Sequence, residues 1–172
     1  MLIGGCFVNP LYNKLEHGSD PYDTRDESAI DTIVIHHVGA AERDYTAQEL
    51  ATYHVRSRGW PGIGYHFVIH PDGRIEQTNK LTSVSWHAGR WNTRSIGIVL
   101  AGTFTNSPPT APCRSRCRQL IGALRIHLGR SLAYLAHRDL DNTGYGPTEC
   151  PGATWPSWRD SLNPLPRHVA VK

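Results

Sequence analysis

Short apolar runs alternate along the chain with stretches whose apolar residues recur every three or four positions. Four runs rich in β-branched and apolar residues predict strands: 31–38, 65–70, 95–102 and 132–136. Residues 74–78 follow the second run after the turn sequence Pro71-Asp72-Gly73. This turn chemistry predicts that the two flanking segments pair as a hairpin.

Amphipathic stretches between the strands predict helices. Thr46-Ala-Gln-Glu49 resembles a capping box and opens a helix over 46–57. Residues 114–130 carry leucine and isoleucine at helical spacing, and 155–162 reads as a last helix with a proline in its first turn. Residues 105–112 hold three prolines and predict a loop. This order of elements predicts a single α/β domain with a central mixed β-sheet flanked by helices.

The length of 172 residues suits one domain. Residues 1–28 are rich in glycine, proline, asparagine and aspartate. They are expected to form an N-terminal arm, either extended along the domain or flexible, and residues 29–172 are expected to form the domain itself.

Composition excludes several classes of partner. Hydrophobic residues make up 39% of the chain and charged residues 19%, enough for one buried core. The formal charge of +3 lacks the dense lysine and arginine runs of a nucleic-acid-binding surface, so no nucleic-acid partner is expected. The apolar runs are too short to span a membrane, and only five residues, none of them basic, precede Cys6, so neither a membrane span nor a secretory signal is expected. Cys113 and Cys117 lie four residues apart and are compatible with a disulfide or with two unpaired thiols.

Three residues with soft donor atoms follow predicted strands. His36 ends the first strand, His137 directly follows the strand at 132–136, and Cys150 lies in the loop beyond. Two imidazoles and a thiolate suit zinc, and three protein ligands leave a fourth position for water, as in zinc sites that hydrolyse amides. On spacing alone, two packed histidines and a buried thiol are an equally good interpretation.

Six blocks of sequence, in order, resemble the zinc N-acetylmuramoyl-L-alanine amidase family, which includes phage lysozyme-amidases and animal peptidoglycan-recognition proteins. The resemblance covers about residues 31–162. The blocks are Thr32-Ile-Val-Ile-His-His-Val-Gly, Gly64-Tyr-His-Phe-Val-Ile, Trp86-His-Ala-Gly, Asn92-Thr-Arg-Ser-Ile-Gly-Ile, Ala136-His-Arg-Asp and Pro147-Thr-Glu-Cys-Pro-Gly.

The resemblance implies a fold, a cofactor and a catalytic set. It implies the amidase and peptidoglycan-recognition fold, with Zn²⁺ held by His36, His137 and Cys150. Tyr65 matches the family tyrosine beside the reacting water and is expected to stabilise the oxyanion. Thr148 stands where some members have lysine, so it is expected to contribute to catalysis without a positive charge.

The resemblance also places four residues along the substrate groove. His87, Asn92, Trp86 and Arg94 are expected to contact glycan or stem peptide, with His87 as a further donor to the transition state. Trp60 and Trp91 are candidates for the same stacking role or for packing.

The implied function is hydrolysis of the amide bond between N-acetylmuramic acid and L-alanine in bacterial peptidoglycan. A phage endolysin is the first interpretation, acting as a monomer that reaches the wall from the host cytoplasm through a holin. The alternatives are a peptidoglycan-binding module without activity and a cytoplasmic wall-recycling amidase. Cys150 favours catalysis because non-catalytic relatives usually lack the cysteine ligand.

Overall fold

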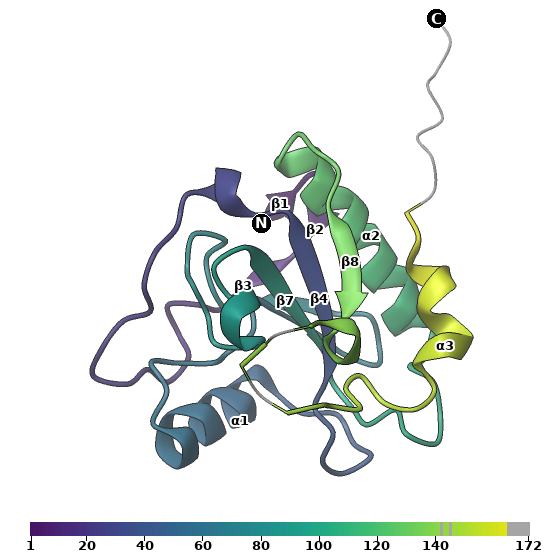
Figure 1. Cartoon of the computed structure of the whole chain (residues 1–172), viewed down its shortest axis with the longest axis horizontal. Helices are drawn as coiled ribbons and strands as arrows, with labels where there is room; N and C mark the ends of the chain where they lie inside the picture. Colours follow the sequence, from purple (N-terminus) through teal and green to yellow (C-terminus); the bar gives the residue numbers. More distant parts are fainter. Residues whose placement is uncertain (142, 145, 165–172) are drawn as a thin grey trace, which may run out of the picture.

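The computed structural model describes residues 1–141, 143–144 and 146–164 and shows a mixed β-sheet with helices packed against it (Figure 1). The six strands lie in the order β3 (Asn9–Pro10), β6 (Ile75–Gln77), β5 (Phe67–Ile69), β7 (Ser95–Leu100), β4 (Thr32–His37) and β8 (Ala133–Ala136). Neighbouring strands are parallel except β5 and β6, which form the predicted antiparallel hairpin. The predicted α/β fold with a central mixed sheet is confirmed.

Successive residues of the central strands face two different hydrophobic clusters, because side chains alternate between the faces of a sheet. Ile98 of β7 packs in the cluster that contains Leu124 of α2 (Ala111–His127). The next residue, Val99, packs in the cluster that contains Leu50 of α1 (Ala47–Thr52). The sheet therefore separates an α2 face from an α1 face.

The helix α1 begins as its sequence predicts. The Thr46 side chain accepts from the backbone N–H of Glu49, and the Glu49 carboxylate accepts from the backbone N–H of Thr46, which is a complete capping box. The helix continues over Tyr53–Ser57 with π-helical hydrogen bonding. Near the end of the described chain, α3 (Trp155–Trp158) runs on as a 3₁₀ turn, Arg159–Leu162.

The helix α2 begins three residues earlier than the sequence pattern predicts. The Thr110 hydroxyl accepts from the backbone N–H of Cys113 and caps the helix, so Ala111 and Pro112 are helical. Pro112 is tolerated there because the first turn of a helix needs no backbone N–H donor. The prediction of a loop over 105–112 is therefore wrong for its last two residues.

The first ten residues belong to the packed structure. Strands β1 (Leu2–Ile3) and β2 (Cys6–Phe7) form a small antiparallel hairpin, and β3 extends the main sheet beside β6. Ile3, Cys6 and Val8 are buried in the cluster under α2.

The four cysteines are all unpaired, so the Cys113 and Cys117 pair is two buried thiols rather than a disulfide. Within the described ranges, none of the helices combines the length and apolar character required to cross a bilayer.

Candidate metal centre and active site

The register of two parallel strands brings His36 and His137 together. Ile35 of β4 pairs with Ala136 of β8, so His36, the next residue of β4, and His137, the first residue after β8, lie at the same end of the two parallel strands. The ring centroids of the two histidines lie 4.7 Å apart. The third member, Cys150, lies in a loop held against this edge, where its carbonyl accepts from the backbone N–H of Arg138 at 2.8 Å.

The donor atoms of His36, His137 and Cys150 lie within 4.8 Å of one another. His36 Nδ1 is 3.7 Å from Cys150 Sγ, and the backbone N–H of His37 donates to the same sulfur at 3.4 Å. A hydrogen bond of this kind stabilises a thiolate. Two imidazole nitrogens and one sulfur at this spacing fit zinc and leave room for a fourth ligand.

Burial sets the protonation of these ligands. Burial, reinforced by His87 and His137, lowers the pKa of His36 well below its ordinary value, so its ring is neutral and has a lone pair to offer. Burial also lowers the pKa of His137. The pKa of Cys150 is raised by burial to about 12, so the thiol keeps its proton at neutral pH until a metal displaces it.

Tyr65 lies beside the ligands in the turn before β5. Its ring centroid is 5.2 Å from that of His36, and its backbone carbonyl accepts from the side chains of Thr78 and Asn79. Burial raises the pKa of Tyr65, so its phenol stays protonated and is able to donate a hydrogen bond.

Thr148 contacts the backbone of the loop that carries Cys150. Its hydroxyl oxygen accepts from the backbone N–H of Cys150 at 3.2 Å. The neighbouring Glu149 is exposed and forms an ion pair with Arg138 at 3.1 Å. The structure therefore places Thr148 where it orients the loop that carries the thiol.

His87 lies behind His36 with only 8% of its surface exposed. Its Nδ1 is 3.1 Å from His36 Nε2, and its Nε2 is 3.4 Å from Ser95 Oγ. The ring packs on β7 at Gly97, where a Cβ atom would approach His87 Cγ to 2.7 Å. Sequence reasoning missed this contact and missed Ser95, although a glycine within an apolar strand is a signal of close approach by another group.

The other predicted groove residues lie in different settings. Asn92 Oδ1 accepts from the backbone N–H groups of His87 and Ala88, so it stabilises the turn over residues 87–92. Trp86 is 41% exposed and, with Trp60, lines a cavity of about 180 Å³. Arg94 forms an exposed ion pair with Asp31.

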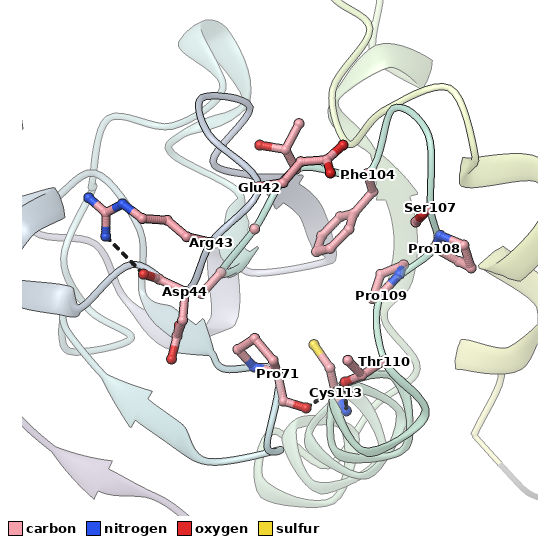
Figure 2. Close-up of a pocket in the computed structure, with 13 residues that line it drawn as sticks. Glu42, Arg43, Asp44, Pro71, Phe104, Ser107, Pro108, Pro109, Thr110 and Cys113 are labelled. Atoms are coloured by element: carbon pink, nitrogen blue, oxygen red, sulfur yellow. Dashed lines mark hydrogen bonds between the residues drawn. The ribbon is translucent and has the colours of Figure 1, made fainter.

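A separate cavity of about 220 Å³ lies between the loops that follow β4 and β7 (Figure 2). Glu42, Arg43 and Asp44 line one side, Pro108 and Pro109 line the other, and Cys113 lies at its α2 end. Its lining residues are distinct from those predicted for the active site.

Beside that cavity, another buried histidine, His70, has carboxylate partners. His70 Nδ1 is 2.7 Å from Asp44 Oδ1, and His70 Nε2 is 3.0 Å from Glu76 Oε2. Arg74 forms an ion pair with the other oxygen of Glu76. With both ring nitrogens hydrogen-bonded to carboxylates, His70 has no lone pair left for a metal.

The sheet, the three converging donors and the adjacent phenol define a one-domain α/β protein with a site suited to a single zinc ion. Residues 26–153 match the family described as N-acetylmuramoyl-L-alanine amidase, so the chain belongs to this family.

Relatives of two kinds share the fold. Peptidoglycan-recognition protein SC2 of Drosophila melanogaster is 30% identical over 121 residues, which cover 65% of this chain and 63% of that protein. The endolysin amidase LysCS of Clostridium intestinale URNW superposes with a TM-score of 0.72 at 26% identity, covering 92% of this chain and 96% of that one. Peptidoglycan recognition protein LE, solved with tracheal cytotoxin, superposes with a TM-score of 0.71 at 25% identity, covering 84% and 87%. The chain spans less than two thirds of the length of curated relatives such as this recognition protein.

Proposed function

We propose that this protein is a zinc-dependent amidase that cleaves the bond between N-acetylmuramic acid and L-alanine in bacterial peptidoglycan. The observation that carries the proposal is the convergence of His36, His137 and Cys150 within 4.8 Å, with the Tyr65 ring beside them. Three neutral or thiolate donors in a half-buried setting match the ligand requirements of a catalytic zinc ion.

When bound, zinc supplies a Lewis acid that polarises a carbonyl and activates water at neutral pH. The side chains of the protein supply stabilisation of the transition state and positioning of the ligands. The protonated phenol of Tyr65 donates to the oxygen on which negative charge develops, because a fixed donor next to that oxygen stabilises the transition state more than the ground state. Thr148 holds the loop of Cys150 in place through the backbone.

Binding of the substrate is assigned to the surface beside Trp60 and Trp86. The two rings meet edge to face at 6.2 Å, and the exposed face of Trp86 offers a platform for a sugar or peptide. The complex of the related protein LE with tracheal cytotoxin, a monomeric peptidoglycan, supports this class of ligand.

The proposed setting is a phage endolysin that reaches the wall from the host cytoplasm through a holin. Similarity to the LysCS endolysin over almost the whole described fold supports this setting. The recognition proteins among the relatives support a second candidate, a peptidoglycan-binding module without activity. The cysteine ligand favours the enzyme.

The experiment is a cleavage assay on purified peptidoglycan with zinc content measured in parallel. Cys150→Ser is expected to lose both bound zinc and release of muramyl-linked peptide while remaining folded. Cys6→Ser is the matched control, because Cys6 is likewise unpaired but lies in β2, away from the three donors. Full cleavage by Cys150→Ser would overturn the role of Cys150 as a zinc ligand and with it the proposed zinc-dependent mechanism. Wild-type protein that binds peptidoglycan without cutting it would overturn the enzyme proposal and establish the binding module instead.

A further inference from the structure

A line of hydrogen-bonding groups leads away from His36 on the side of its second ring nitrogen. His36 Nε2 lies 3.1 Å from His87 Nδ1, and His87 Nε2 lies 3.4 Å from Ser95 Oγ. The Ser95 hydroxyl donates in turn to the backbone carbonyl of Trp91 at 2.6 Å. The line connects a proposed metal ligand to the main chain of the 3₁₀ turn Gly89–Trp91.

The direction of every hydrogen bond in this line is fixed from its far end. A backbone carbonyl only accepts, so the Ser95 proton points at Trp91 and Ser95 Oγ accepts from His87 Nε2–H. A neutral imidazole carries one proton, so His87 Nδ1 has a lone pair and accepts from His36 Nε2–H. His36 Nδ1 is then left unprotonated, and this is the atom that faces Cys150 Sγ.

We infer that His87 and Ser95 are positioning residues that hold His36 in the tautomer whose Nδ1 is free to bind the metal. The inference rests on the proposed metal site and adds a role that the ligands themselves do not supply. Metal-binding histidines generally donate their other N–H to a carboxylate, a carbonyl or water. Here the Trp91 carbonyl is the final acceptor, and the His87 imidazole and the Ser95 hydroxyl link it to His36. This arrangement orients the His36 ring without placing a negative charge beside it.

The surroundings of His87 are built to hold its ring in one orientation. The ring lies on the bare backbone of Gly97, where a side chain would collide with it. Asn92 Oδ1 accepts from the backbone N–H of His87 at 3.0 Å and fixes the start of the side chain. The planes of the His36 and His87 rings are at 88° to each other, so His36 Nε2 lies against the edge of the His87 ring.

The first test measures the zinc affinity of the metal-free 172-residue chain by competition with a chromogenic chelator. His87→Leu removes the acceptor for His36 Nε2–H and is expected to weaken zinc binding by about 10- to 100-fold. His87→Asn is the rescue variant: its Oδ1 is able to accept in place of Nδ1, so affinity is expected to stay within about threefold of wild type. His70→Gln, a change at a buried histidine with carboxylate partners, is expected to leave zinc affinity unchanged.

The second test reads the tautomer directly in the metal-free wild-type protein by long-range ¹⁵N–¹H NMR. His36 and His87 are each expected to carry the proton on Nε2. A wild-type protein that binds no zinc would overturn the proposed function. Tight zinc binding by the wild type and equally tight binding by His87→Leu would overturn the inference alone, as would a proton on His36 Nδ1. The wild-type spectrum decides the matter even where His87→Leu does not fold.

Discussion

His36 and His70 are the same residue type in nearly the same degree of burial, with 2% and 0% of their surfaces exposed, yet their chemistry is opposite. His36 faces the imidazoles of His87 and His137 and the sulfur of Cys150. His70 lies between two carboxylates. The partners, rather than the burial, decide what each histidine is able to do.

The direction of the pKa shift expresses this difference. At His36, burial lowers the pKa, the ring stays neutral and a lone pair remains for a metal. Burial alone would also lower the pKa of His70, but hydrogen bonds to Glu76 and Asp44 outweigh it and raise the pKa. The raised pKa favours the protonated form of His70, which pairs with Asp44 and Glu76 and so joins the residue 39–46 loop to the β5–β6 hairpin.

Exchanging each histidine for glutamine should separate the two roles most sharply. His36→Gln removes a ligand and is expected to abolish zinc binding and peptidoglycan cleavage, because two remaining donors do not hold the ion. His70→Gln is expected to keep both near wild-type levels at a temperature where it is folded. Zinc content and peptide release are measured on both variants. Loss of zinc from His70→Gln would mean that the two regions are not independent.

Tyr65→Phe should affect turnover without affecting the metal. Removal of one hydrogen-bond donor to a developing oxyanion typically slows the chemical step by about 10²- to 10³-fold. Zinc content is expected to equal that of wild type, because the phenol is not a ligand. An unchanged rate of peptide release would remove Tyr65 from the mechanism.

His70→Gln should reduce stability even though it spares the site. Breaking a buried ion pair commonly costs about 3–5 kcal/mol, but the Asp44 side chain is 45% exposed, so a loss of about 2 kcal/mol in the free energy of unfolding is expected. Urea unfolding of the metal-free proteins measures this difference. A difference in unfolding free energy near zero would show that the contacts of His70 with its two carboxylate partners do not stabilise the fold.

The same stability difference should depend on pH in a predictable direction. Because the folded pKa of His70 is raised, its contribution is complete below the unfolded value of about 6.5 and is lost as pH rises through the folded pKa. Burial opposes ionisation of Glu76, but its hydrogen bond to His70 and the nearby Arg74 outweigh burial and lower the pKa of Glu76, so this partner remains a carboxylate over the same pH range. The gap between wild type and His70→Gln is expected to be largest near pH 5–6.5 and to narrow above it. A gap that widens with pH would contradict a cationic His70.

Much of the sheet was predictable from local pattern. The apolar runs gave β4 and β7 within two residues at either end, and period-2 alternation placed His36 and His37 on opposite faces. Resemblance of short blocks identified Tyr65 and the three donors that the structure brings together. These features depend on residues close in sequence or on motifs.

The remaining features depend on contacts between distant segments. The register of β4 on β8 determines that His36 meets His137, and no local pattern encodes a register. The fit of His87 over Gly97 and the meeting of Asp44 with His70 require β5, β7 and their loops to be in place first. For this reason sequence reasoning placed His87 in a substrate groove and had no signal for the contact between Asp44 and His70.

The proposed function depends on one zinc ion held by two histidines and one cysteine, with a fourth position open to solvent. X-ray absorption spectroscopy of the zinc-loaded protein reports the atoms around the ion. We expect one equivalent of zinc with one sulfur neighbour at about 2.3 Å and nitrogen or oxygen neighbours at about 2.0–2.1 Å, one of them exchangeable for an added anion. A first shell without sulfur, or one that no anion perturbs, would contradict it.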